Sequence, residues 1–153
     1  MTYKIRVSDP RCKFSAAHFL YQHDKCSRLH GHNYLVNVDI EGELNEQFYI
    51  VDFYEVKQLL MGITNELDHR MLLPSANENI KITEDATKKQ IFVDFNKKHY
   101  EFPKQDVCLL PIPATTAEIL AKYVYDKLKK RFSSYIITVY VGEAEGSVAS
   151  YTE

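Results

Sequence analysis

Apolar and polar side chains alternate along four stretches of the chain, and this period of two is typical of half-buried β-strands. The first stretch is interrupted at Pro10, where we expect a bend or bulge because proline cannot donate to a strand ladder. Alternation in the next stretch begins with two histidines and continues with apolar residues. The predicted strands are residues 3–9 continued as 12–18, then 30–41, 135–141 and 147–151.

Residues 52–68 instead repeat apolar side chains at helical spacing, which predicts a helix with one face packed on the sheet. Asp52 is the predicted N-cap, and Glu55 is the reciprocal partner three residues later. We expect the helix to end at the polar triplet Asp68-His69-Arg70, where a loop begins.

A second helix is predicted after Pro111 and Pro113, with Thr115 or Thr116 as its N-cap. Taking Thr115 as the cap gives Glu118 the N3 position of a capping box. Lysines and an arginine at the other end suit the negative pole of the helix dipole.

Residues 75–109 are less regular and contain no catalytic constellation. Short apolar runs around 80–82, 91–95 and 100–102 predict a β-rich insertion of three strands separated by polar turns. The order strand, strand, helix, insertion, helix, strand, strand predicts an α+β domain. We therefore expect one domain over 1–153, with a four-stranded antiparallel sheet and two helices on one face.

Composition excludes several classes of protein. The chain of 153 residues is 45% apolar and 26% charged with a net charge of −2, so it offers no electrostatic case for nucleic acid. Its apolar runs are too short to span a membrane, and its N-terminus lacks signal-peptide features. Three cysteines without regular spacing predict no disulfide framework, and Cys12 and Cys108 are predicted to be inert. We expect a cytoplasmic protein.

Three histidines are predicted to converge at one end of the sheet. His18 ends the face of one strand, while His30 and His32 begin the same face of the next strand, with Gly31 leaving room between them. Three neutral imidazoles are the usual protein ligands of a catalytic zinc ion, although they also suit other divalent metals. The alternatives are hydrogen-bonded core histidines or surface histidines near a turn.

Two further groups could move protons. Cys26 lies four residues before His30, and its basic neighbours Lys25 and Arg28 favour a reactive thiolate. The alternatives for this cysteine are an inert buried residue or a fourth zinc ligand. Asp68 and His69 could form a carboxylate–imidazole proton shuttle, or merely an ion pair at the end of a helix.

Glu143 follows Gly142 at the end of the strongly apolar strand 135–141. Its carboxylate could accept two hydrogen bonds from an amino-imine edge of a ligand. Taken alone, a solvated turn residue is the simpler interpretation.

Taken together, six segments in the same order resemble the family of 6-pyruvoyltetrahydropterin and 6-carboxytetrahydropterin synthases. The resemblance covers almost the whole chain apart from the insertion at about 75–109. The similar segments are FSAAH at 14–18, C-x3-HGHNY at 26–34, VDF at 51–53, LDH at 67–69, TTAE at 115–118, and Glu143.

The resemblance implies the tunnelling fold (T-fold), in which the sheets of three subunits close into a barrel. Two such trimers commonly stack into a homo-hexamer with active sites at the subunit interfaces. The resemblance also implies three sets of site residues. The zinc ligands are His18, His30 and His32, and the acid–base residues are Cys26, Asp68 and His69. The pterin contacts are Glu143, Thr116 and Glu118. One departure is Ile119, where the family often has asparagine.

The three-residue gap between Cys26 and His30 resembles the 6-carboxytetrahydropterin synthases of the 7-deazapurine (queuosine and archaeosine precursor) pathway. The implied reaction converts 7,8-dihydroneopterin triphosphate to 6-carboxytetrahydropterin, acetaldehyde and triphosphate. Lys25, Arg28 and Arg70 are candidates for contacting the triphosphate. The alternatives are a 6-pyruvoyltetrahydropterin synthase and a non-catalytic zinc-binding or pterin-binding module of the same fold.

Overall fold

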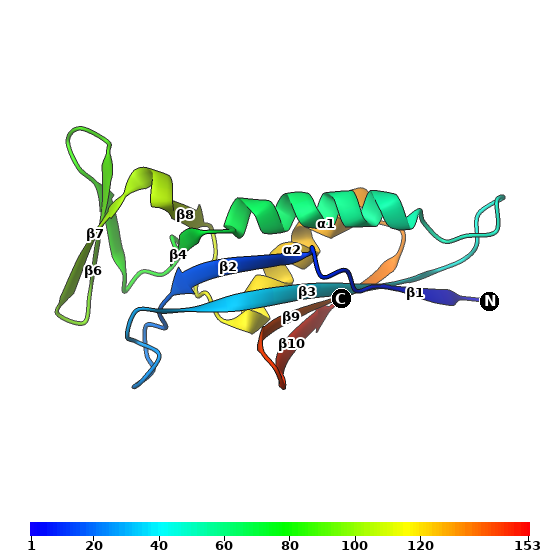
Figure 1. The fold of residues 1–153 in the computed structure, drawn as a ribbon, viewed down its shortest axis with the longest axis horizontal. Helices are drawn as coiled ribbons and strands as arrows, with labels where there is room; N and C mark the ends of the chain where they lie inside the picture. The colour runs from blue at the N-terminus through cyan, green and yellow to red at the C-terminus, as the bar shows by residue number, and fades with distance from the viewer.

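The computed structural model describes residues 1–153 as two sheets and two long helices (Figure 1). The helices are α1, Phe53–Leu67, and α2, Ala117–Arg131, and a short 3-10 helix spans Lys104–Asp106. The strands are β1 Tyr3–Val7, β2 Lys13–His18, β3 His30–Gly42, β4 Arg70–Pro74, β5 Lys81–Glu84, β6 Gln90–Phe95, β7 Lys98–Pro103, β8 Val107–Leu110, β9 Ile136–Ala144 and β10 Ser147–Thr152.

The long strand β3 is the centre of the main sheet. β9 pairs with one edge of β3, while β1 and β2 lie end to end along the other edge, all antiparallel. The predicted break around Pro10 is therefore confirmed as the short segment that separates β1 from β2. β10 completes the four predicted antiparallel strands by pairing with β9.

The main sheet is larger than the sequence predicts. It has seven strands and continues beyond β2 with β4 and β8, which pair in parallel. The prediction of a loop directly after α1 is therefore wrong. β8 belongs to the main sheet and not to the predicted insertion at 75–109. Most of β4 is buried, so its short apolar run has no alternation to reveal it.

Both helices cover the same face of the sheet, as predicted for an α+β domain. Asp52 caps α1 by accepting a hydrogen bond from the Tyr54 backbone N–H at 2.8 Å. Thr116, not Thr115, caps α2 through the Ile119 N–H, so Glu118 lies at N2 rather than N3. The two helices and the inward side chains of the sheet form one core of 27 buried residues. Neither helix has the length and apolar character needed to cross a bilayer.

The insertion forms the predicted three strands, β5, β6 and β7, in a separate antiparallel sheet. It projects at the same end of the molecule as the loop between β2 and β3, and the N-terminus lies at the opposite end (Figure 1). A smaller core joins this sheet to the rest of the chain. Its buried members are Phe19, Met71, Leu73, Ile80, Ile91, Val93 and Phe95.

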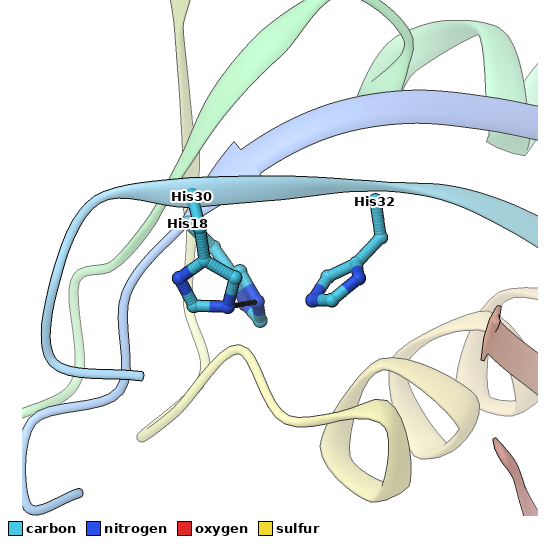
Figure 2. A group of neighbouring side chains, drawn as sticks. All are labelled: His18, His30 and His32. Atoms are coloured by element: carbon cyan, nitrogen blue, oxygen red, sulfur yellow. Dashed lines mark hydrogen bonds between the residues drawn. The ribbon is translucent and has the colours of Figure 1, made fainter. Parts of the chain in front are cut away.

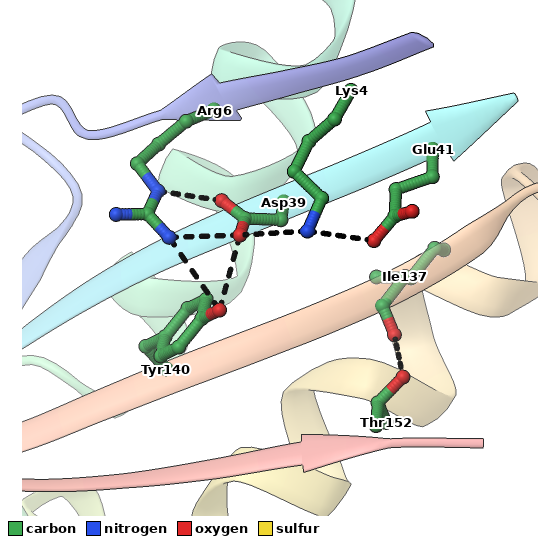
Figure 3. A network of polar contacts seen from close by, with 7 residues as sticks. All are labelled: Lys4, Arg6, Asp39, Glu41, Ile137, Tyr140 and Thr152. Atoms are coloured by element: carbon green, nitrogen blue, oxygen red, sulfur yellow. Dashed lines mark hydrogen bonds and ion pairs between the residues drawn. The ribbon is translucent and has the colours of Figure 1, made fainter. Parts of the chain in front are cut away.

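A charged network lies across β1, β3 and β9 (Figure 3). Asp39, only 1% exposed, accepts two hydrogen bonds from the Arg6 guanidinium and one from the Tyr140 hydroxyl. These bonds, led by those from Arg6, lower the pKa of Asp39 despite its burial. Lys4 bridges Asp39 to Glu41 at the edge of the network. The network binds three strands together with fully partnered charges.

Candidate active site

The three predicted histidines meet at the ends of two paired strands (Figure 2). His18 is the last residue of β2 and lies directly opposite His30, the first residue of β3, while His32 follows on the same face. Their ligand nitrogens all lie within 4.8 Å of one another. Strand alternation and antiparallel register therefore produce the predicted cluster of imidazoles.

Backbone carbonyls set the tautomers of two of these rings. His18 Nδ1 donates to the Thr115 carbonyl at 2.9 Å, and His30 Nδ1 donates to the Arg28 carbonyl at 2.7 Å. Because a carbonyl only accepts, each neutral ring carries its proton on Nδ1 and leaves Nε2 as a lone-pair donor.

The two free Nε2 atoms approach to 3.1 Å, as the dashed line in Figure 2 marks. With both protons already used at Nδ1, two lone pairs face each other, an arrangement that a cation between them would stabilise. A tetrahedral zinc ion with Zn–N bonds of about 2.0–2.1 Å holds two ligand nitrogens about 3.3 Å apart. The donor set and spacing therefore fit zinc.

Burial keeps His18 in the form that binds metals. The residue is 1% exposed, and burial, with a smaller contribution from the neighbouring imidazoles, lowers its pKa to about 4. The Thr115 carbonyl opposes this shift only in part. The ring is therefore neutral at physiological pH and available as a ligand.

Tyr34 links the histidines to Glu143. Its hydroxyl lies 3.4 Å from both ring nitrogens of His18, and its ring stacks on Phe14 with centroids 4.5 Å apart. Leu35 pairs with Gly142, and continuing this register by one residue puts Glu143 opposite Tyr34. The pKa of Tyr34 is raised first by burial and then by the Glu143 carboxylate. Glu143 is half-buried, and this register places it on the same face as the histidines.

Asp68 and His69 form a hydrogen-bonded pair in the tight connection between α1 and β4. The Asp68 carboxylate accepts from His69 Nδ1 at 2.7 Å and from the Ser15 backbone N–H at 2.8 Å. The Ser15 bond, followed by the His69 bond, lowers the pKa of Asp68. His69 has a φ of 55°, a strained left-handed conformation that is common at functional sites.

The pair and the histidine cluster lie on opposite faces of the sheet. His69 lines a cleft of about 520 Å³, to which His32 also contributes, together with Ser15 and Asn33. The side chains of Ser15 and Asn33 alternate with the inward-facing residues of β2 and β3 and so lie on the other face of the sheet from the histidine side chains. His69 itself is exposed, with 83% of its side chain accessible. Within one chain, the structure therefore does not bring the pair to the inner side of the histidine cluster.

Cys26 lies partly buried in the loop between β2 and β3. Its backbone N–H donates to His23 Nδ1 at 3.0 Å, and its carbonyl accepts from the Leu20 N–H at 2.8 Å. Its sulfur makes no hydrogen bond to the histidine cluster or to the Asp68–His69 pair. Cys12 is fully buried in the core, and burial raises the pKa of the Cys12 and Cys108 thiols. Both fit the predicted inert role.

The other candidate site residues have more ordinary surroundings. The Thr116 side chain is used as the cap of α2, and Glu118 is exposed in the first turn of that helix. Lys25 and Arg28 are exposed in the β2–β3 loop, while the guanidinium of Arg70 donates to the carbonyl of Gln105.

Thr115 is a site residue that the sequence pattern did not indicate. Its carbonyl fixes the tautomer of His18, and its hydroxyl lies 3.2 Å from the same nitrogen and donates to the Phe19 carbonyl at 3.3 Å. The adjacent threonines Thr115 and Thr116 are the sequence feature that could have indicated this role. Only one of them can cap the helix, so the other is free to contact the site.

Comparison with known proteins relates this chain to tetrahydropterin synthases. The family model described as 6-pyruvoyl tetrahydropterin synthase matches residues 9–153. A Methanocaldococcus jannaschii protein described as a putative 6-carboxy-5,6,7,8-tetrahydropterin synthase is 38% identical over 146 residues, which cover 91% of this chain and 88% of that protein. The 6-carboxy-5,6,7,8-tetrahydropterin synthase of Aquifex aeolicus is 32% identical, covering 85% and 77% of the two chains.

A solved structure extends the similarity to the fold. The crystal structure of 6-pyruvoyl tetrahydropterin synthase from Plasmodium vivax superimposes with a TM-score of 0.91 at 25% identity, covering 100% of this chain and 98% of that one. The tunnelling fold expected from the sequence is thereby confirmed.

Proposed function

Because this chain belongs to the 6-pyruvoyl tetrahydropterin synthase family, we propose that it is a zinc-dependent lyase of the 6-carboxytetrahydropterin synthase type. In this proposal it converts 7,8-dihydroneopterin triphosphate and one water to 6-carboxy-5,6,7,8-tetrahydropterin, acetaldehyde and triphosphate. The product is a precursor for 7-deazapurine biosynthesis in the cytoplasm. The names of the archaeal and bacterial relatives support the carboxy branch over the pyruvoyl branch.

The facing Nε2 atoms of His18 and His30 carry the proposal of a metal. They lie 3.1 Å apart while both Nδ1 atoms are used on backbone carbonyls, and His32 supplies a third ligand within reach. Three histidines leave a coordination position open for substrate. Zinc bound there would act as a Lewis acid toward the side-chain oxygens of the substrate.

The protein groups have separate tasks in the proposed reaction. The Cys26 thiolate removes a proton from the substrate side chain. Asp68 holds His69 through Nδ1, which leaves Nε2 of His69 free to return or relay a proton. Glu143, half-buried beside Tyr34, accepts two hydrogen bonds from the amino-imine edge of the pterin ring.

The complete site requires a second copy of the chain. Asp68 and His69 are on the sheet face opposite His18 and Glu143, so one subunit cannot present both sets to one substrate. Association through the sheets would bring the exposed pair of one subunit to the histidine cluster of its neighbour. We therefore infer a homo-oligomer with shared sites, and the family resemblance implies that it is a hexamer built from two trimers.

The first experiment is product analysis. Zinc-loaded protein is incubated with 7,8-dihydroneopterin triphosphate, and the products are identified by mass spectrometry. Carboxytetrahydropterin with acetaldehyde is expected, whereas a pyruvoyl product would transfer the chain to the other branch. Absence of turnover would favour the non-catalytic module. Cys26→Ala should abolish turnover while keeping zinc and pterin binding, and unchanged turnover would remove Cys26 from the mechanism.

Mixed oligomers test the shared site. Cys26→Ser and His69→Ala are each expected to be inactive alone, because each lacks one half of the acid–base set. If equal amounts of the two variants exchange subunits at random, about a quarter of the shared sites combine an intact Cys26 with an intact His69. The mixture should therefore recover about a quarter of the wild-type rate. A mixture as inactive as the separate variants, despite demonstrated subunit exchange, would contradict an active site formed between copies.

A further inference from the structure

The β6–β7 hairpin of the insertion reaches the loop that carries Cys26. The Asn96 side-chain amide donates to the Tyr21 carbonyl at 2.9 Å, and the Lys98 ammonium donates to the Ser27 carbonyl at 2.7 Å. The two acceptors lie on either side of Cys26 in the sequence, and Ser27 is its direct neighbour. The hairpin therefore contacts the loop both before and after the cysteine.

The hairpin is built to hold these two donors in place. Asn96 and Lys97 form its tip with φ values of 48° and 62°, the conformation of a tight two-residue turn. Phe95, just before the tip, stacks on Phe19 at the start of the loop with ring centroids 4.2 Å apart. The Lys98 ammonium also lies 5.4 Å from the centre of the Phe95 ring. Stacking thus fixes the hairpin against the base of the loop.

The loop depends on this support. Its own bonds are internal, such as those from the Leu20 N–H to the Cys26 carbonyl and from the Ser27 N–H to the His23 carbonyl. The bonds from Asn96 and Lys98 are the hydrogen bonds that connect residues 20–27 to segments outside the β2–β3 loop. Internal bonds preserve the shape of a loop, whereas bonds to other segments help to hold it in position relative to the sheet.

We propose that the β6–β7 hairpin is a clamp that positions Cys26 for proton transfer, with Lys98 and Asn96 as its positioning residues. This role rests on the proposed function, since it assumes that Cys26 reacts with substrate. A charged donor bound to a carbonyl makes a strong contact, and a small displacement of a reacting group is costly to the rate. In this proposal the insertion contributes to catalysis by holding Cys26 in position.

The test compares variants of the full-length, zinc-loaded protein. Lys98→Met keeps the apolar stem and removes the ammonium, while Asn96→Gly removes the amide and tolerates the positive φ. Lys97→Met is the matched control, because it removes the same charge from an exposed neighbour that makes no bond to the loop. We expect Lys98→Met to lower kcat about tenfold with KM and zinc content unchanged. Asn96→Gly should act similarly, and the control should behave as wild type.

Two measurements distinguish positioning from general stability. Alkylation of Cys26 by iodoacetamide, followed by peptide mass spectrometry with Cys108 as internal reference, should be faster in Lys98→Met, and amide exchange in 20–27 should increase. Lys98→Arg, which restores a charged donor, should recover kcat. Wild-type kcat and alkylation in both clamp variants would overturn the proposal. The alkylation and exchange measurements need no turnover, so failure of the pterin reaction would be recognised separately.

Discussion

Gly31, between His30 and His32, offers a direct test of the geometry of the proposed metal site. A Cβ atom added at this position would lie 2.8 Å from the Ala16 backbone oxygen, about 0.6 Å closer than the 3.4 Å at which ordinary contact begins. The neighbour is backbone within the β2–β3 ladder and cannot rotate away. Gly31→Ala must therefore push β2 and β3 apart beside the histidine cluster.

The size of the effect follows from this displacement. Forcing extra volume into a packed region costs about 1–3 kcal/mol, which lowers the melting temperature by about 2–12 °C for a chain of this length. Metal sites tolerate distance changes of about 0.2 Å, so separating His18 from His30 should weaken zinc affinity by about tenfold or more.

Thermal denaturation of the metal-free protein and zinc competition against a chromogenic chelator measure the two effects separately. Gly62→Ala is the control, because a Cβ atom there meets nothing within 4 Å and the residue lies inside α1. This control should gain about 0.5–1 kcal/mol of stability from improved helix propensity. If Gly31→Ala retained both the stability and the zinc affinity of the wild type, the argument from close strand approach would be refuted.

Three further predictions concern other parts of the molecule. Thr115→Val should weaken zinc binding by a few-fold in a competition assay, because His18 loses the hydroxyl near Nδ1 but keeps the carbonyl. Asp68→Asn should lower kcat while leaving zinc content unchanged, and a wild-type rate would exclude the proton relay. Arg6 lowers the pKa of Asp39 in the folded state, so the ionised Asp39 carboxylate stabilises the fold. This stabilisation is present above the unfolded pKa of about 3.9 and is lost as pH falls through the folded pKa. Asp39→Asn should therefore lower the urea midpoint at pH 7, and its deficit should shrink below about pH 4.

Local periodicity was enough to predict both helices, the four antiparallel strands and the three strands of the insertion. The same period of two put His18, His30 and His32 on one face, and the structure brings their nitrogens within 4.8 Å. These features depend on neighbouring residues along the chain, so they can be recognised without knowledge of the fold. Family motifs added predicted roles for Cys26 and Glu143, which spacing alone left open.

Strands β4 and β8 could not be recognised in this way. Each has only four or five residues, and the mainly buried run of β4 lacks alternation. Parallel pairing also joins segments that are distant in the sequence, since Met71 pairs with Val107. No local signal distinguishes such a strand from a short apolar loop.

The sequence by itself determined the class of the fold, the family, and the histidines that are suited to a metal. Only the tertiary structure decided that Thr115, 97 residues away, orients His18, and that Asp68 and His69 occupy the other face of the sheet. The physical reason is that strand alternation is a property of adjacent residues. Tautomers, sheet faces and loop contacts arise between segments that meet only when the whole chain is folded.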